Sequence, residues 1–416
     1  MLEILSHSSH FLPFLSPKRR REIGKTQLSF FDFSPHFQIS LSIEADFRKY
    51  LLSLMCKRSK ESDMDNLMRK LPIGIQTFED IRRKNYLYVD KTALVWRMAN
   101  LGKPYFLSRP RRFGKSLLLS TFESYFLGKK ELFEGLAIEQ METEWTEYPV
   151  LHLDLNAEKY DKPEKLNDIL SNHLTQWELQ YGKGLDEKTP SARFGGVIRR
   201  ACEQTGHQVV VLVDEYDKPL LQAITNLELL EEYRQSLKAF YGVLKSTDRY
   251  LRFVFLTGVT KFSQVSVFSD LNQLNDISLD YSYATLCGIT REELIATFKP
   301  EIETFGRKNH QTPEEVVTAM ERNYDGYHFH PDGDGVFNPF SVLNAFSKLE
   351  LGNYWFQTGT PTFLIELLQK SDYDLRTLLN GIEAPVSSFA EIGITGWFIL
   401  DFKSSISIAD LRSVLL

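Results

Sequence analysis

The sequence predicts an α/β protein in which a parallel sheet is flanked by helices and is followed by a helical region. Between residues 68 and 285, short apolar runs alternate with amphipathic stretches of helical period, which is the pattern of α/β organisation. One of these runs, VVVLV at 209–213, is continuous and β-branched, as expected of a strand buried on both faces of a parallel sheet. Beyond about residue 285 the strand patterns stop and helical patterns take over. We therefore expect a core over 68–285 and a C-terminal helical lid-like region over 286–395.

The individual elements are expected where an apolar run or an amphipathic stretch is bounded by turn residues. The apolar runs predict strands at 104–107, 150–156, 209–217 and 251–258. The stretches of helical period predict helices at 117–128, 163–182 and 227–247. In the helical region, capping boxes begin at Thr290 and Thr312, and a residue before a proline marks two further helix starts at Asn338 and Thr360.

The composition indicates an ordinary globular protein. The chain has 416 residues, of which 43% are hydrophobic and 25% charged, and its net charge is −6. The negative charge argues against a chain-wide nucleic-acid footprint, although it leaves open a local one. The three cysteines, Cys56, Cys202 and Cys287, are far apart, which indicates a reducing compartment without a disulfide framework. No apolar run is long enough to span a membrane, so we expect a cytoplasmic protein.

Residues 1–67 differ from the chain that follows. They mix serine, phenylalanine and basic runs such as KRRR at 18–21 and KRSK at 57–60, with little sustained period. We interpret them as an irregular N-terminal extension, with a small N-terminal subdomain as the alternative. The basic runs are expected to be solvated, as short runs of this kind usually are, rather than to bind nucleic acid or anionic lipid.

The segment RPRRFGKS at 109–116 ends like a phosphate-binding loop but begins unlike one. In the usual pattern, G-x-x-x-x-G-K-S/T, a glycine stands where this chain has Arg109. A predicted strand precedes the segment and a predicted helix follows it, as the binding of an anion at a helix N-terminus requires. An arginine followed by proline is biased to extended backbone, so the loop is expected to begin along a different path. Taken alone, the segment is also compatible with a basic patch or a targeting signal.

The phosphate-loop interpretation assigns a role to each of its last residues. Gly114 lets the backbone approach a ligand closely, Lys115 contacts the β and γ phosphates, and Ser116 holds Mg²⁺ through its hydroxyl. The expected nucleotide-binding residues are Arg109, Pro110, Arg111, Arg112, Phe113, Gly114, Lys115, Ser116 and Leu117.

An acidic pair, Asp214 and Glu215, follows the predicted buried strand that begins at 209, which is the pattern of a Walker B element. The first acid can reach a Mg²⁺ held by the loop serine, and the second can polarise the attacking water. Two ordinary acids at the solvent end of a strand are the alternative. Because the loop and the acids occur in order, with a further predicted strand between them, the sequence favours nucleotide binding, with ATP and Mg²⁺ as the expected cofactors.

Three more residues are candidates for phosphoryl-transfer chemistry. Thr257 ends the next predicted strand, where many P-loop ATPases place a polar residue that senses the γ-phosphate, although threonine is also a common turn residue there. Arg111 and Arg112 either neutralise phosphate charge or pair with acids such as Asp217. The candidate catalytic residues are therefore Lys115, Glu215, Thr257, Arg111 and Arg112, and the candidate metal ligands are Ser116 and Asp214.

A second constellation lies in HFHPDGDG at 328–335, where histidines and aspartates alternate at His328, His330, Asp332 and Asp334. In an extended segment these side chains share one face and can ligate a divalent metal. However, the sequence PDGDG has strong turn chemistry, so we favour a solvated hairpin tip.

Seven ordered motifs between residues 68 and 395 together resemble the AAA-ATPase-like family of bacterial P-loop proteins: RKLPIGIQTFEDIRRKNYLYVDKT, FLSRPRRFGKSLLLSTFESYF, VVVLVDEYDKPL, TGVTKFSQVSVFSDLNQLNDIS, YDGYHF, FNPFSVLNAF and YWFQTGTP. The resemblance implies an AAA-like P-loop NTPase fold. In the family the loop itself reads RPRRFGKS, so Arg109 is the family's own form. By resemblance, Lys115 and Ser116 are the phosphate and Mg²⁺ residues, Asp214 and Glu215 the Walker B pair, and Thr257 the sensor-like residue.

Members of this family typically continue into a nuclease-like domain of the PD-(D/E)XK type. Here the tail at 396–416 diverges from that pattern and contains no D…E-x-K motif. We therefore expect no nuclease activity from this chain. Together, the divergent tail and the unfamiliar leader at 1–67 suggest a truncated or frame-disturbed gene product.

Three functions stay open at this point. The first is an ATP hydrolase whose conformational cycle drives a partner or an assembly. The second is a nucleotide-binding switch without significant turnover, and the third is the ATPase remnant of a nucleic-acid-processing nuclease system. A nucleotide is the expected ligand in all three. The sequence leaves open a homo-oligomer and identifies no protein partner.

Overall fold

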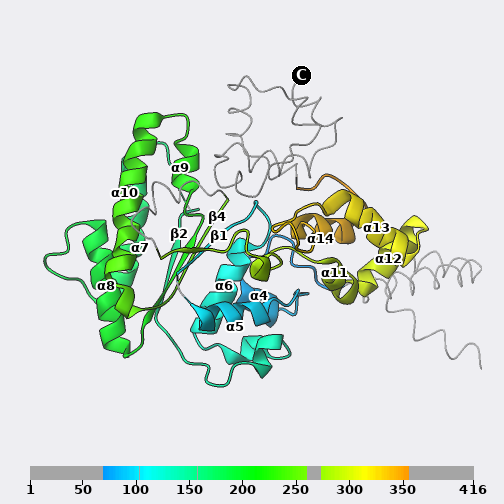
Figure 1. The fold of residues 1–416 in the computed structure, drawn as a ribbon, viewed down its shortest axis with the longest axis horizontal. Coiled ribbons are helices and arrows are strands. Elements are labelled where there is room, and N and C mark those ends of the chain that lie inside the picture. Colours follow the sequence, from blue (N-terminus) through cyan, green and yellow to red (C-terminus); the bar gives the residue numbers. More distant parts are fainter. Residues whose placement is uncertain (1–68, 103, 157, 260–272, 356–416) are drawn as a thin grey trace, which may run out of the picture. The chain divides into compact units, whose positions relative to one another are not determined.

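The computed structural model describes residues 69–102, 104–156, 158–259 and 273–355, all of which belong to one compact unit, Met68–Leu416 (Figure 1). Its centre is a parallel sheet in which the described strands follow the order β2-β3-β4-β1-β5. The strands are β1 Tyr105–Ser108, β2 Val150–Asp154, β3 Val209–Asp214, β4 Leu251–Gly258 and β5 Asn275–Asp276. The predicted fold class, a parallel sheet flanked by helices and followed by a helical region, is confirmed.

Strand β3, which lies between β2 and β4, is buried at every position because both faces of the sheet are covered. Its side chains alternate between two apolar cores. Val209, Val211 and Val213 pack on one face, whereas Val210 and Leu212 pack on the other. The run at 209–213 is therefore apolar at every position because each face of the strand packs into a core of its own.

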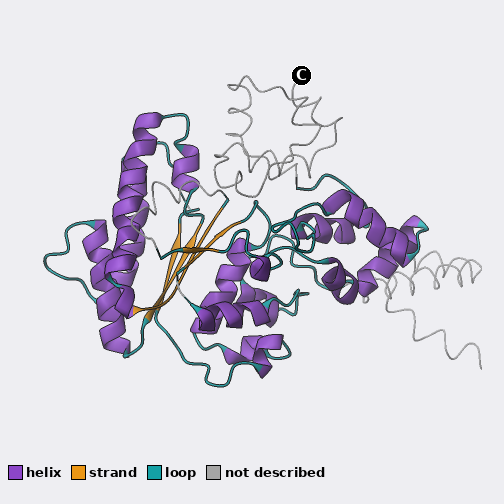
Figure 2. Cartoon of the chain, in the orientation of Figure 1, coloured by secondary structure: helices purple, strands orange, loops and turns teal. Residues whose placement is uncertain are grey.

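Helices cover the sheet on both faces (Figure 2). The core on one face is built with α7 Glu164–Tyr181, α8 Pro190–Thr205 and α10 Leu227–Ser246. The core on the other face is built with α4 Phe78–Arg83, α5 Thr92–Leu101 and α6 Lys115–Phe126. The shorter elements are α9 Lys218–Gln222 and the 3₁₀ turns η3 Lys130–Phe133, η4 Ala137–Gln140, η5 Asp248–Tyr250 and η6 Tyr281–Tyr283.

A separate group of helices follows the last strand, and Figure 1 shows it beyond α4–α6. These helices are α11 Arg291–Thr297, α12 Lys299–Asn309, α13 Pro313–Tyr324 and α14 Pro339–Lys348. They have an apolar core of their own, in which Phe298, Met320 and Phe346 are fully buried. Both predicted capping boxes form, and the side chain of Asn338 caps α14. We call residues 286–355 the helical region.

Most element bounds match the predictions, with one difference that matters for the site. Helix α6 begins at Lys115 instead of residue 117, so Lys115 and Ser116 lie in its first turn. The strand predicted at 209–217 ends at Asp214, where the chain turns. The predictions for residues 1–67, for the helix start at Thr360 and for the tail at 396–416 lie outside the described residues.

Candidate functional site

The predicted site residues meet at the carboxyl edge of the sheet. Strand β4 lies between β1, which leads into the loop at 109–114, and β3, which ends at Asp214. Leu107 is in register with Thr257, and the N–H of Arg109 donates to the carbonyl oxygen of Gly258 at 3.1 Å. Because parallel strands end at one edge, three segments that are far apart in the sequence come together here.

The loop at 109–114 contains two residues with left-handed backbone. Arg112 and Gly114 both adopt the left-handed conformation, with φ angles of 65° and 91°. Alternation of right- and left-handed residues can turn successive N–H groups towards one point, and the N-terminus of α6 follows directly. Glycine adopts a positive φ without penalty, whereas Arg112 is strained there.

Lys115 closes this loop. Its side chain is 5% exposed, and its amine donates hydrogen bonds to the carbonyl oxygens of Arg109 at 3.0 Å and Pro110 at 3.1 Å. The first turn of α6 is thereby tied to the beginning of the loop. Ser116 follows in the same turn and is partly exposed.

The guanidinium of Arg109 points into the interior. It is 1% exposed, and it donates to the carbonyl oxygens of Ser108, Ser278 and Tyr283 at 2.9, 2.7 and 3.1 Å. It also stacks on the ring of Phe329, 3.8 Å from the ring centroid. Burial lowers its pKa to about 10. Where a usual phosphate loop has a glycine, this chain therefore has a buried strut that fixes the beginning of the loop.

Arg111 and Arg112 contact the helical region. The carbonyl oxygen of Arg111 accepts a hydrogen bond from the indole Nε1 of Trp355 at 3.0 Å. The guanidinium of Arg112 lies 4.0 Å from the centroid of the Phe340 ring. Partial burial lowers the pKa of Arg112, and the nearby charge of Arg111 lowers it further.

The acidic pair occupies two different environments. Asp214 is 6% exposed, and its Oδ1 accepts hydrogen bonds from the hydroxyl of Thr257 at 2.7 Å and the N–H of Glu215 at 3.0 Å. Glu215 is less buried and has a left-handed backbone, with φ 51°. Burial raises the pKa of the Glu215 carboxyl, and the positive charge of Lys115 opposes that rise.

One polar pair, formed between β2 and α6, was not predicted. His152, at the middle of β2, shares a 3.0 Å contact between its Nδ1 and the carboxylate of Glu123 on α6. Burial opposes protonation of His152, but the hydrogen bond to Glu123 and its charge outweigh burial and raise the pKa of the imidazole. Two residues further along β2, Asp154 is the register partner of Asp214. The alternation of polar residues in HLD at 152–154 is the sequence signal that could have pointed to this face.

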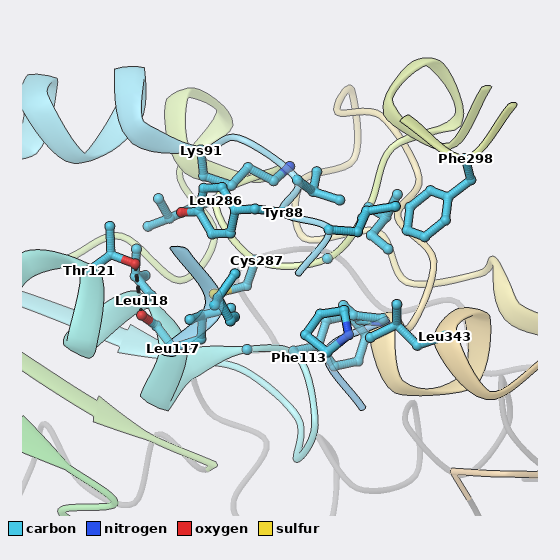
Figure 3. A pocket seen from close by; sticks show the side chains of 18 residues that line it. Tyr88, Lys91, Phe113, Leu117, Leu118, Thr121, Leu286, Cys287, Phe298 and Leu343 are labelled. Carbon is cyan, nitrogen blue, oxygen red and sulfur yellow. Dashed lines mark hydrogen bonds between the residues drawn. The ribbon is translucent and has the colours of Figure 1, made fainter. Parts of the chain in front are cut away.

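A cavity of about 110 Å³ adjoins the loop (Figure 3). Phe113 and Gly114 of the loop contribute to its wall, and Figure 3 shows Phe113 and Leu343 on one side of it, with Tyr88 and Lys91 on the other. The other labelled lining residues are Leu117, Leu118, Thr121, Leu286, Cys287 and Phe298. The lining is thus predominantly apolar and comes from both the core and the helical region.

The remaining candidate residues are those of the segment 328–335 and the cysteines. The hairpin tip is a turn in which the Nδ1 of His330 accepts a hydrogen bond from the N–H of Asp332 at 3.1 Å. Within the part of the chain that the structure describes, no three His, Cys, Asp or Glu side chains are grouped to hold a metal ion. Cys202 and Cys287 are free thiols, and Cys56 lies outside the described residues.

None of the helices in the described ranges has the length and apolar character needed to cross a membrane.

Comparison with known proteins found a matching protein family. Residues 72–268 match the model of the AAA-ATPase-like family, described as predicted AAA-ATPases. An uncharacterised protein encoded in the vnfD 5′ region of Azotobacter chroococcum is 43% identical over 302 residues. The alignment covers 72% of this chain and 56% of that relative, so the chain spans little more than half of the relative's length.

Among solved structures, the ORC2 protein of Aeropyrum pernix is similar over 80% of this chain and 86% of its own. The identity is 12% and the TM-score 0.29, a similarity too weak to carry functional information. The family match covers the loop, the acidic pair and Thr257. Residues 72–268 of this chain thus match the AAA-ATPase-like family, as the sequence motifs predicted.

Proposed function

We propose that the chain binds ATP together with Mg²⁺ and hydrolyses it. The observation that carries this proposal is that the loop and the acidic pair share one edge of the sheet, where Arg109 is hydrogen-bonded to Gly258 and Thr257 to Asp214. Phosphoryl transfer depends on holding the phosphates, the metal and the water in one geometry. The carboxyl edge of the sheet brings together side chains suited to each of these tasks.

The phosphates would be held by the backbone N–H groups of the loop and by Lys115. Ser116 and Asp214 supply the oxygen ligands that Mg²⁺ prefers, and the hydrogen bonds from Thr257 and Glu215 both end on Oδ1 of Asp214. Oδ2 would therefore face the metal, whose charge would compensate that of the phosphates. Arg111 and Arg112 would add positive charge to the site with their side chains turned towards the phosphates.

Glu215 is the proposed general base. A base is most effective when its pKa lies near the working pH, and burial shifts the pKa of this carboxyl in that direction. The carboxylate would accept a proton from the water that attacks the γ-phosphate. Thr257, held on Asp214, would sense the metal and the phosphate through that acid.

The cavity beside Gly114 and Phe113 would hold the nucleoside base. It is predominantly apolar, as sites for flat heterocycles are, and it adjoins the phosphate loop directly. In this arrangement residues 68–285 carry the nucleotide. The helical region closes one side of the base site and so acts as the lid that the sequence predicted.

The test is Mg²⁺-dependent ATP turnover and ATP binding by the wild type, Lys115→Ala and Glu215→Gln. We expect Lys115→Ala to lose binding, and Glu215→Gln to keep binding while turnover falls by about 10²–10⁴-fold. If wild-type turnover equals that of Glu215→Gln while ATP still binds, hydrolysis is excluded and a nucleotide switch remains. If the wild type binds no ATP, both functions are excluded.

A further inference from the structure

Several aromatic side chains of the helical region support the phosphate loop. Trp355 donates to the carbonyl oxygen of Arg111, and Phe340 lies under the guanidinium of Arg112. The ring of Phe113 packs edge-on against two more aromatic rings, 4.6 Å from Tyr327 and 5.6 Å from Phe329. We call Tyr327, Phe329, Phe340 and Trp355 the aromatic clamp.

The loop needs such support because its backbone is strained. Arg112 holds a φ of 65°, a conformation that side chains other than glycine adopt only when the surrounding structure imposes it. Gly114, also left-handed, carries no such strain. The clamp contacts three consecutive residues, 111–113, which are centred on the strained position.

Apolar burial alone does not account for these contacts. Phe113 and Phe329 are 1% and 3% exposed and would pack together in any core. The indole of Trp355, by contrast, donates to a backbone carbonyl of the loop, and Phe340 contacts a cation. These two contacts fix the orientation of a peptide group and of a side chain, which is what a phosphate-binding loop requires.

We propose that the aromatic clamp is a positioning device that holds the loop in its strained, phosphate-binding shape, so that the helical region sets the affinity for nucleotide without touching the phosphates. This inference rests on the proposed nucleotide binding. Since coupling between two sites is reciprocal, bound nucleotide also stabilises the contact between the loop and the helical region. Trp355 and Phe340 are thus positioning residues.

The first test is a double-mutant cycle on ADP affinity, measured by calorimetry. Trp355→Phe keeps an aromatic ring but removes the N–H donor, and we expect it to weaken ADP binding by about tenfold. In an Arg112→Gly background the same change is expected to have little effect, because glycine adopts the left-handed conformation without support. The matched control is Trp177→Phe on α7, at the opposite face of the sheet, which should leave affinity unchanged.

The second test needs no nucleotide. Backbone amides of Arg109 and of residues 111–114 should exchange hydrogen faster in Trp355→Phe than in the wild type or in Trp177→Phe. Wild-type affinity and wild-type exchange in Trp355→Phe would overturn the inference. Equal effects of Trp355→Phe in the wild-type and Arg112→Gly backgrounds would also overturn it, since a general packing defect behaves in this way. A wild type that binds neither ATP nor ADP would overturn the proposed function instead, and the exchange rates would still decide whether the clamp holds the loop.

Discussion

The hydroxyl of Thr257 donates a hydrogen bond to the carboxylate of Asp214 at 2.7 Å, between the ends of two neighbouring strands. Thr257 is fully buried and Asp214 is 6% exposed. An acceptor oxygen in such a place needs its donor, because an unsatisfied buried acceptor is costly. The bond therefore both stabilises the sheet edge and fixes the direction of the acid.

Replacing Thr257 with valine should affect stability and turnover together. Valine has nearly the same shape but no hydroxyl, so Oδ1 of Asp214 loses one of its two donors. We expect the free energy of unfolding to fall by about 1–3 kcal/mol, measured in urea, and ATP turnover to fall with it. Thr257→Ser, which keeps the hydroxyl, should stay near the wild type in both. A valine variant with wild-type turnover would show that the orientation of Asp214 is unimportant for catalysis.

Replacing Asp214 with asparagine should distinguish its role in metal binding from its role in the fold. The amide oxygen can still accept from Thr257, but the charge that would bind Mg²⁺ is gone. We expect nucleotide binding by Asp214→Asn to lose its dependence on Mg²⁺, whereas the wild type should bind more tightly when Mg²⁺ is added. Titrations with Mg²⁺ and with a chelator measure this difference. An unchanged Mg²⁺ dependence would remove Asp214 from the metal site.

The raised pKa of Glu215 predicts two dependences on pH. Turnover requires the ionised carboxylate, so it should decline on acidification through a pKa above the ordinary 4.5. The folded protein also holds this proton more tightly than the unfolded chain. Ionisation of Glu215 therefore reduces stability as the pH rises from 4.5 through the raised pKa. Glu215→Gln should become more stable than the wild type over this window and match it at pH values below the window, as measured by urea unfolding. A stability difference that is constant with pH would contradict the assigned shift.

Arg109 should matter more for stability than for chemistry. Its guanidinium is the donor to the carbonyl oxygens of Ser108, Ser278 and Tyr283, and methionine would leave these three without it. We expect Arg109→Met to lower the free energy of unfolding by about 3–5 kcal/mol. The matched control is Arg111→Met, which removes an arginine from the same loop and should change stability little. Equal losses in the two variants would show that Arg109 is not a structural strut.

Much of the fold could be predicted because the buried strands have clear apolar boundaries. Strand β4 has the bounds predicted for it, and Val209–Asp214 was recognised by its β-branched run. Helix α8 was missed because Gly195 and Gly196 weaken its helical pattern, yet packing of Phe194 and Val197 outweighs that propensity. Strand β5 has two residues and gives no pattern at all.

The site was predictable only as far as the sheet determines it. Lys115, Asp214 and Thr257 meet because parallel strands share a carboxyl edge, and this rule needs only the sequence order. The path of Arg109 and the contact between Trp355 and Arg111 depend on packing between residues that are far apart in the sequence. No local pattern encodes such contacts, so they had to come from the structure.

The cavity gives the last prediction, because it can be filled from a residue outside the loop. Leu343 lines it from α14, in the helical region and outside the phosphate loop. Leu343→Trp should fill part of the cavity, exclude the base and weaken ATP binding, while inorganic tripolyphosphate, which has no base, should bind as it does to the wild type. Calorimetry with both ligands measures the contrast. Equal weakening of both would indicate a damaged loop, and ATP binding at the wild-type level would show that the base lies elsewhere.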